Sequence, residues 1–345
     1  MEKGINMKIV ITGGAGFIGS QLGHYLSSAG HSITLLDDMS FGNEDNLRIN
    51  GHRFGHFQKV DVRNKLDQLF ENTDVVFHFA GISSLPECQS NPIYALDVNV
   101  TGTANVLESC RKAGVKKIVF SSTSAVYENN KSTPFREADA VQPNLIYSIS
   151  KLQGEHLCRS YVDNYGMDVS VIRFFNVYGA HQDFKRTSPP LMGYITRELL
   201  LNKSPIFHSS GHQRRDYINI QDIVLLCELA MNRKTDSFEI YNACAGTTYS
   251  VREIFAIFQK HLNKEDIQPI FRDASLFWEK YPDLHKGRFK LDPQVLTKEV
   301  EKCSLGDPTL AKTVFGWKAS KTLEEGVKEI CSFVKDNLDR YKVDL

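Results

Sequence analysis

A tyrosine and a lysine stand four positions apart in the segment Tyr147-Ser148-Ile149-Ser150-Lys151. On a helix this spacing places the phenol and the ammonium group on the same face. A phenol with its ordinary pKa of roughly 10 is a poor base at neutral pH. A nearby cation lowers that pKa, because it stabilises the phenolate. The pair therefore has the chemistry of a general base with its own activating group, although the spacing alone is common on surface helices.

A cluster of hydroxyl side chains lies upstream of this pair. The segment 117–127 has the sequence KIVFSSTSAVY, an apolar run that ends in serines and threonine. Parallel sheets bind ligands beyond the carboxyl ends of their strands, so Thr123 and Ser124 are expected to face a reacting group. Serine and threonine are also favoured in ordinary turns after strands. The hydroxyl cluster is thus compatible with catalysis and with a simple turn.

Three glycines follow the first apolar run of the chain. The sequence IVITGGAGFIG places Gly13, Gly16 and Gly19 between that run and a helical stretch opened by Phe17 and Ile18. Glycine is required where a chain turns tightly, where backbone approaches a pyrophosphate, and where a helix packs closely on a strand. The N–H groups at the start of the following helix then bind phosphate. The pattern predicts a dinucleotide site.

An acidic residue follows this turn at the distance that such a site needs. Asp37 ends the apolar run SITLLD, 18 residues beyond Gly19. A carboxylate here binds the ribose hydroxyls of the adenosine and repels a 2′-phosphate. Asp38 adds a second negative charge, and no arginine follows before Arg48. NAD is therefore predicted in preference to NADP.

Short apolar runs alternate with helical stretches through the first half of the chain. This alternation predicts an α/β fold with a doubly wound parallel sheet of the Rossmann type. We expect an NAD-binding domain of residues 1–179 plus about 219–249. A smaller mixed α/β substrate lobe would hold about 180–218, which looks loop-rich, plus 250–345. The expected strands are Lys8–Thr12, Ser32–Asp37, Phe57–Val60, Val75–Ala80, Lys117–Ser122 and Val169–Phe174, and the expected helices are Phe17–Ala29, Val98–Ala113, Leu145–Tyr165 and 322–339.

The bulk composition restricts the partners of the chain. It carries 41 basic and 41 acidic residues, so its formal net charge is zero, and neither nucleic acid nor an anionic membrane is an expected partner. No apolar run is long enough to span a bilayer, and we expect a cytoplasmic protein. The seven cysteines are scattered without metal-ligand spacing, as expected of buried free thiols, and no metal site is predicted.

Taken together, these motifs resemble the extended short-chain dehydrogenase/reductase family, and within it the nucleotide-sugar epimerases of the UDP-glucose 4-epimerase type. The resemblance covers nearly the whole chain. The signatures in order are TGGAGFIG, Asp61-Val62-Arg63, His78-Phe79-Ala80-Gly81, Asn99-Val100-Thr101-Gly102-Thr103, SSTSAVY, YSISK, RFFNVYG, Arg215-Asp216-Tyr217 and Phe315-Gly316-Trp317.

The resemblance implies roles for several of these residues. Thr123, Tyr147 and Lys151 would form the catalytic trio, with Lys151 also holding the nicotinamide ribose. The remaining cofactor contacts would come from Asp61 and Val62 at the adenine and from Ala80, Gly81 and Asn99 along the dinucleotide.

The resemblance also implies a nucleotide-diphosphate sugar as the substrate. Ser124 and Asn176 would contact the sugar or its diphosphate, and the fork-shaped guanidinium of Arg215 would pair with the diphosphate. Ser304 falls near the position that limits sugar size, where a small residue would admit a 2-N-acetyl group. A plain loop role for Ser304 is equally compatible with the sequence. The family's dimer-forming helices resemble 98–113 and 145–165, so a homodimer is expected.

Within this family the sequence favours 4-epimerisation through a transient 4-keto sugar. Dehydratases carry an acidic pair after the catalytic threonine, whereas this chain has Ser124 and Ala125, which cannot act as general acids. The alternative is a dehydrogenase, reductase or dehydratase of the same family.

The sequence departs from the family pattern at two places, the second of which lacks an arginine for the diphosphate. Ser209-Ser210-Gly211 stands where Gly-Asp-Gly is usual, and Thr297–Val300 replaces a late Arg-x-Gly-Asp. Lys298 or Arg288 would have to substitute for the missing arginine, but a lysine lacks its bidentate geometry.

Overall fold

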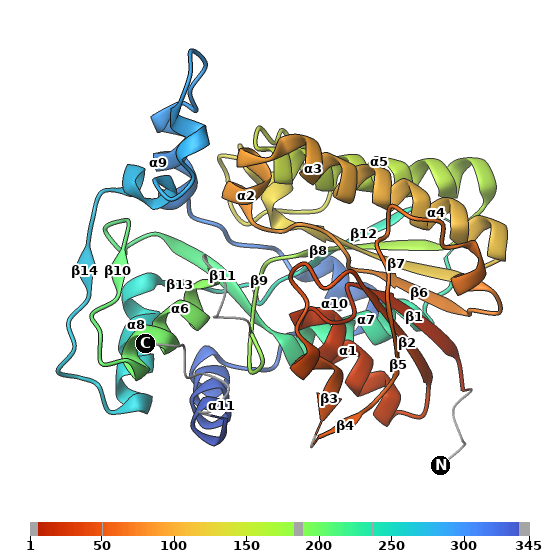
Figure 1. Cartoon of the computed structure of the whole chain (residues 1–345), viewed down its shortest axis with the longest axis horizontal. Coiled ribbons are helices and arrows are strands. Elements are labelled where there is room, and N and C mark those ends of the chain that lie inside the picture. Colours follow the sequence, from red (N-terminus) through yellow and green to blue (C-terminus); the bar gives the residue numbers. More distant parts are fainter. Residues whose placement is uncertain (1–5, 50, 183–188, 236, 338–345) are drawn as a thin grey trace.

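The computed structural model describes residues 6–49, 51–182, 189–235 and 237–337. Its centre is a seven-stranded sheet in the order β12-β8-β7-β6-β1-β2-β5, in which every pairing is parallel. Helices lie on both faces of this sheet (Figure 1), which confirms the predicted doubly wound α/β class. The strands of this sheet are β1 (Lys8–Thr12), β2 (Ser32–Asp37), β5 (His56–Lys59), β6 (Val75–His78), β7 (Lys117–Thr123), β8 (Val169–Phe174) and β12 (Glu239–Ala243).

Helices in the described ranges cover the faces of this sheet or belong to the rest of the chain. They are α1 (Phe17–Ser28), α2 (Leu85–Ser90), α3 (Pro92–Leu96), α4 (Gly102–Ala113), α5 (Ile146–Tyr165), α6 (Leu191–Leu200), α7 (Ile220–Asn232), α8 (Val251–Leu262), α9 (Pro293–Glu301), α10 (Thr309–Phe315) and α11 (Leu323–Asp336). No helix within these ranges has both the length and the apolar character needed to cross a membrane.

Alternate residues of the central strands supply two different cores. In β1, Ile9 and Ile11 pack with α1 and α7 on one face, while Val10 packs with α4 and α5 on the other. All three side chains are buried. Strands covered on both faces are apolar along their whole length, which explains the near-continuous hydrophobic runs of the sequence.

The chain builds the sheet outward in two directions from β1. It first runs to β2 and β5, and then returns to β6, β7, β8 and finally β12. The reversal lies between β1 and β6. At such a reversal the connections leave in opposite directions, and the carboxyl ends of the two strands border a crevice. The sheet topology therefore places the ligand site beside the glycine turn.

A second hydrophobic core lies beyond the sheet. It joins α6, α8 and α11, and includes Ile195, Phe258 and Val327. Beside it a small sheet contains the strands β9 (Asn176–Tyr178), β11 (Arg214–Asn219) and β13 (Thr248–Ser250). The described ranges also contain two short strand pairs, β3 (Arg48–Ile49) with β4 (His52–Arg53) and β10 (Ile206–Phe207) with β14 (Ile270–Phe271), besides isolated bridges.

The six expected strands are all present, with ends shifted by no more than two residues. The predicted helix 98–113 begins later, at Gly102, after a π turn at Asp97–Thr101. Helix α6 lies in the segment expected to be loop-rich, of which residues 183–188 fall outside the described ranges. Helix α10 packs against β12, so part of the C-terminal segment belongs to the main core. The proposed division into two domains remains a prediction.

Residues 273–301, here called the cover segment, form a projection beside α2 (Figure 1). The segment contains two short 3₁₀ turns, at Ala274–Trp278 and Pro282–His285, and α9. Asp292 caps α9 by accepting a hydrogen bond from the N–H of Gln294 at 2.9 Å. Within α9 the buried residues are Leu296 and Glu299, so this helix carries little apolar periodicity.

Candidate active site

One large cleft opens beyond the carboxyl ends of the central strands and encloses about 1060 Å³. Its wall runs from the glycine turn to the cover segment. All the predicted site residues line it except Asn99. Those that line it are Gly13, Gly16, Phe17, Ile18, Gly19, Asp37, Asp61, Val62, Ala80, Gly81, Thr123, Ser124, Tyr147, Lys151, Asn176, Arg215 and Ser304.

The glycine turn has no space for side chains. Gly13 has a φ of 70°, and a Cβ there would lie 2.8 Å from the backbone nitrogen of Ala80. A Cβ on Gly19 would collide with the carbonyl oxygen of Gly13. Helix α1 begins directly after Gly16 without a side-chain cap, so its first N–H groups can bind an anion. The turn therefore fits a pyrophosphate.

Asp37 lies at the end of β2 with 9% of its surface exposed. Its carboxylate accepts hydrogen bonds from the N–H groups of Ala15 at 3.0 Å and Met39 at 2.8 Å. Burial raises the pKa of Asp37, while these backbone bonds lower it. Asp37 thus fixes the glycine turn as well as facing the cleft. Asp38 is instead bonded within its own turn, to the backbone N–H and the hydroxyl of Ser40.

Asp61 and Val62 form the end of the cleft next to β5. The carboxylate of Asp61 pairs with Arg63 at 2.5 Å, and this contact lowers the pKa of Asp61. Arg63 also pairs with Asp97 at 2.9 Å. The carbonyl of Val62 accepts a hydrogen bond from Asn105 at 2.6 Å. These contacts hold the residues predicted to flank the adenine.

A buried histidine supports the wall at Ala80 and Gly81. The hydroxyl of Thr12 contacts Nδ1 of His78 at 2.8 Å and accepts a hydrogen bond from the N–H of Ala80 at 3.2 Å. His78 also contacts the hydroxyl of Thr103 at 3.0 Å. Burial lowers the pKa of His78 to about 3, so this histidine is neutral and positions the backbone.

Asn99 lies behind the cleft wall. Its side-chain oxygen accepts from the N–H of Ile82 at 2.8 Å, and its amide nitrogen donates to the carbonyl of Ile82 and to the hydroxyl of Ser150, both at 3.0 Å. Asn99 therefore ties the loop after β6 to α5, next to Lys151. The structure shows a positioning contact here, and the predicted contact with the cofactor remains a prediction.

The predicted catalytic trio lies together in the cleft. Thr123 ends β7, and its side chain lies near enough to Tyr147 to favour the ionised phenol. Tyr147 is the second residue of α5, and Lys151 follows one turn later. The ammonium of Lys151 lies 4.4 Å from the ring centre of Phe120, and the side chain is buried. The local helix thus brings the phenol and the ammonium to one face, as the spacing predicts.

The acid–base properties of the pair differ from the simple expectation. Burial raises the pKa of Tyr147 to about 12, although the hydrogen bond with Thr123 lowers it. Burial also lowers the pKa of Lys151 to about 8. The start of α5 supplies positive potential at Tyr147. The burial of the phenol therefore opposes its ionisation in the protein without a ligand.

A buried ion pair fixes the elements that carry the predicted catalytic trio. Glu155 of α5 pairs with Arg173 of β8 at 2.7 Å, and both side chains are buried. Glu155 also accepts a hydrogen bond from the hydroxyl of Ser122, and Arg173 donates to the hydroxyl of Tyr127 at 2.7 Å. A buried ion pair is stable only when its remaining groups are bonded in this way. The network fixes α5 against β7 and β8.

Two of the predicted substrate residues, Asn176 and Arg215, come from the small sheet, whereas Ser124 directly follows β7. Asn176 of β9 donates to the carbonyl of Asp216 at 2.8 Å. Arg215 of β11 donates to the carbonyl of Glu299 at 2.7 Å and lies 3.7 Å from its carboxylate. Ser304 is buried and forms a backbone bridge with Arg215. The cover segment and β11 therefore meet at Arg215.

The two proposed substitutes for the missing arginine lie in different places. Lys298 lines the cleft and donates a hydrogen bond to the side chain of Asn129. Arg288 lies 5.6 Å from the ring centre of Phe289 and is not among the described residues of the cleft wall. Of the two, only Lys298 is placed to meet a ligand.

Sequence reasoning missed Glu128. Its carboxylate accepts hydrogen bonds from the N–H groups of Asn144 at 3.0 Å and Leu145 at 3.1 Å. These groups directly precede α5, so Glu128 fixes the helix that carries Tyr147. Its partners lie 16 and 17 residues away across an irregular segment, and no local pattern signals such a contact.

Comparison with known proteins agrees with this geometry. The model of the NAD dependent epimerase/dehydratase family matches residues 9–244. The chain belongs to this family. The chain is 30% identical to the UDP-glucose 4-epimerase of Bacillus subtilis, over 97% of this chain and 99% of that protein.

Two solved structures of relatives share the whole fold. A UDP-glucose 4-epimerase from Thermotoga maritima, solved with UDP-glucose, has a TM-score of 0.84 at 28% identity and covers 96% of this chain and 100% of that one. A UDP-N-acetylglucosamine 4-epimerase from Methanobrevibacter ruminantium was solved in complex with UDP-N-acetylmuramic acid. It has a TM-score of 0.82 at 26% identity, and the match covers 96% of this chain and 99% of that one.

Membership of the NAD-dependent epimerase/dehydratase family confirms NAD as the cofactor. The residues present fit that molecule. The side-chain-free turn at Gly13 and Gly19 leaves room for a pyrophosphate at the start of α1, and Asp37 ends the neighbouring strand. Tyr147 and Lys151 lie in the same cleft. The chain is therefore an NAD-dependent enzyme of this family.

Proposed function

We propose that this chain is an NAD-dependent nucleotide-sugar 4-epimerase that acts on a UDP-hexose or a UDP-N-acetylhexosamine through a transient 4-keto intermediate. The observation that carries the proposal is the grouping of Thr123, Tyr147 and Lys151 in one cleft with the glycine turn. The 4-epimerase relatives support this choice within the family.

In this proposal Tyr147 is the base for the C4 hydroxyl of the sugar. The O4–H bond breaks and the proton passes to the phenolate oxygen, while Thr123 holds both by hydrogen bonding. Lys151 stabilises the phenolate. NAD, when held in the cleft, would supply the acceptor for the C4 hydride and allow its return to the opposite face of the 4-keto sugar. The proton then goes back from Tyr147 to O4, and no second substrate is consumed.

The substrate is proposed to lie between β9, β11 and the cover segment. Ser124 and Asn176 would contact the sugar or its diphosphate, and Arg215 with Lys298 would bind the diphosphate charge. Ser304, which is buried in the wall, would border the sugar. We also propose a homodimer through α4 and α5.

The competing function is a dehydrogenase, reductase or dehydratase of the same family. Dehydration requires a general acid beside the catalytic threonine, and here Ser124 and Ala125 follow Thr123. The nearby carboxylate of Glu128 is bonded to two backbone N–H groups. Epimerisation is therefore the better match.

The test is to incubate the purified protein with each of four nucleotide sugars, without added cofactor, and to analyse the products by nuclear magnetic resonance. The four are UDP-glucose, UDP-galactose, UDP-N-acetylglucosamine and UDP-N-acetylgalactosamine. We expect interconversion of at least one C4-epimeric pair. Accumulation of reduced cofactor in proportion to the substrate consumed would instead assign the protein to the dehydrogenases or reductases.

A further inference from the structure

The cover segment forms part of the cleft wall, although it lies outside residues 9–244, which the family model matches. Phe277, Trp278, Lys280 and Lys298 all come from this segment and line the cleft. The ring of Phe277 lies 6.0 Å from that of His208, which follows β10. This wall therefore carries recognition groups that the family signature does not specify.

Trp278 is the most deeply buried of these groups, with 1% of its surface exposed. It shares one apolar cluster with Leu145, Leu284 and Leu296. Leu145 is the cap residue of α5 and stands two positions before Tyr147. The indole is thus held rigidly near the start of the catalytic helix.

The indole N–H of Trp278 is buried and has no hydrogen-bond partner among the described residues. The other tryptophan of the chain, Trp317, donates to the carbonyl of Asp222 at 3.1 Å. An indole N–H can only donate, and a buried donor without an acceptor is costly. In a residue that lines a ligand cleft, this unpaired donor indicates an acceptor on the ligand.

We propose that Trp278 is a specificity-determining residue that donates a hydrogen bond to the carbonyl oxygen of a 2-acetamido group on the substrate sugar. The inference rests on the proposed function, because it takes the ligand to be a UDP-sugar. It narrows that function to UDP-N-acetylglucosamine and its C4 epimer.

The surroundings of Trp278 distinguish between possible acceptors. The buried members of this cluster besides Trp278 are all leucines, so a sugar hydroxyl at the indole would find no acceptor for its own proton among them. A carboxylate would bring a charge into the same apolar surroundings, which costs far more. An acetamido group brings a neutral carbonyl together with a methyl group that packs on apolar side chains.

Ser304 is consistent with this choice. It is buried in the wall of the same cleft, and its side chain is among the shortest that could stand there. Its backbone is fixed, because it donates to the carbonyl of Arg214 and accepts from the N–H of Asp216, both at 2.9 Å. The short side chain of Ser304 and the donor of Trp278 therefore favour the same substrate class.

The test compares the wild type with Trp278→Phe, which removes the N–H group and keeps an aromatic ring. We expect the KM for UDP-N-acetylglucosamine to rise about tenfold, as for the loss of one buried hydrogen bond. The KM for UDP-glucose is expected to stay within about twofold. Trp317→Phe is the matched control and should leave the ratio of the two KM values unchanged. Equal changes for both substrates, or no change for either, would overturn the proposal.

A binding measurement on the wild type separates this proposal from the proposed function. Trp317 is bonded to Asp222 and is not among the described residues of the cleft wall, so a change in tryptophan emission on titration reports Trp278. UDP-N-acetylglucosamine should bind more tightly than UDP-glucose and change the emission. If this difference in binding is found but no sugar is converted, the proposed 4-epimerase function is rejected and the acetamido site at Trp278 is retained. If the sugars are converted but UDP-N-acetylglucosamine and UDP-glucose bind equally tightly without changing the emission, the acetamido site at Trp278 is rejected and the 4-epimerase function is retained.

Discussion

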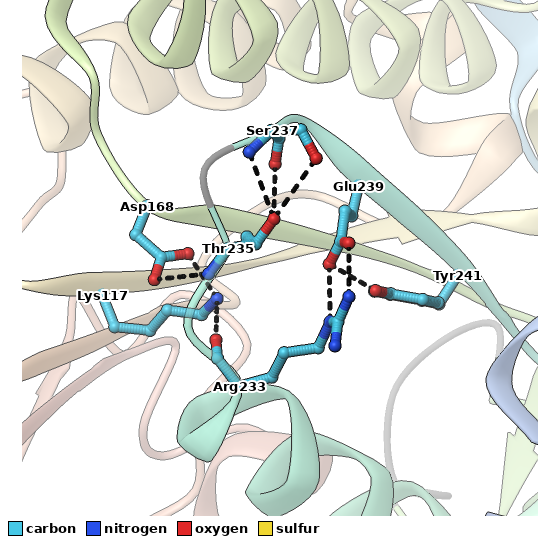
Figure 2. Close-up of polar contacts among 7 residues, drawn as sticks. All are labelled: Lys117, Asp168, Arg233, Thr235, Ser237, Glu239 and Tyr241. Atoms are coloured by element: carbon cyan, nitrogen blue, oxygen red, sulfur yellow. Dashed lines mark hydrogen bonds and ion pairs between the residues drawn. The ribbon is translucent and has the colours of Figure 1, made fainter. Parts of the chain in front are cut away.

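A buried lysine lies at each end of the central sheet, and the two lysines differ in their polar partners. At the amino end, Lys117 begins β7 and lies 2.5 Å from the carboxylate of Asp168 and 2.7 Å from the carbonyl of Arg233 (Figure 2). At the carboxyl end, Lys151 lies over the ring of Phe120 and has no ion pair among the described residues. Burial lowers the pKa of both lysines.

The polar groups around Lys117 are bonded to one another. Arg233 pairs with Glu239 at 2.8 Å, and Glu239 accepts a hydrogen bond from Tyr241 (Figure 2). Asp168 also accepts from the N–H of Thr235 at 3.3 Å. This cluster joins the connection between α7 and β12 to the starts of β7 and β8. Polar residues at the amino end therefore stabilise the fold, whereas Lys151 remains available for a ligand at a cost in stability.

The largest expected effect is that of Tyr147→Phe. Loss of the general base should lower kcat by about 10²–10⁴-fold. The phenol is not part of the fold's internal ion pairs, so NAD binding and the melting temperature should stay close to those of the wild type. Steady-state kinetics and calorimetry check the two parts of this prediction, and an unchanged kcat would remove Tyr147 from the mechanism.

Lys151→Met should lower activity and raise stability. The lowered pKa of about 8, against an ordinary 10.5, means that the folded protein binds fewer protons than the unfolded chain between those pH values. Wild-type stability therefore rises with pH through this window, and the cost of burying the charge is fully present below it.

Lys151→Met has no charge at this position and therefore lacks the cost of burying one. We expect it to be more stable than the wild type by roughly 1–3 kcal/mol at pH 7, with the advantage disappearing towards pH 10.5. Denaturant unfolding across this pH range provides the measurement. An advantage that grows with pH would contradict the assignment.

Lys117→Met provides the matched comparison at the amino end. It removes the same type of side chain but leaves the carboxylate of Asp168 without its cation, so we expect a loss of about 2–3 kcal/mol in the free energy of unfolding. The kcat of the folded fraction should be unchanged, because the site lies at the opposite end of the strands. A stable variant with impaired turnover would break the comparison between the two ends.

The smallest effect is expected for Glu239→Gln. The partner, Arg233, is partly exposed, with 37% of its side chain accessible, so water replaces much of the lost interaction. We expect a loss of about 0.5–1 kcal/mol and no change in activity. Chemical denaturation would measure it, and a loss as large as that of Lys117→Met would show that the cluster acts as one unit.

The parts of the molecule that local patterns specify could be predicted from the sequence. The turn at Gly13 and the helix face shared by Tyr147 and Lys151 each depend on neighbouring residues, and both occur as expected. Glu128 and Trp278 could not be predicted, because their environments depend on segments that are distant in sequence. The pKa of Tyr147 also departs from expectation, since burial raises it to about 12.

The most direct test of the proposed chemistry uses a UDP-sugar that carries deuterium at C4. The protein is incubated with this substrate in ordinary water without added cofactor, and the C4 epimer is examined by mass spectrometry and nuclear magnetic resonance. Internal return of the hydride predicts a product that keeps its deuterium at C4. A product that has exchanged this deuterium for hydrogen would contradict the mechanism.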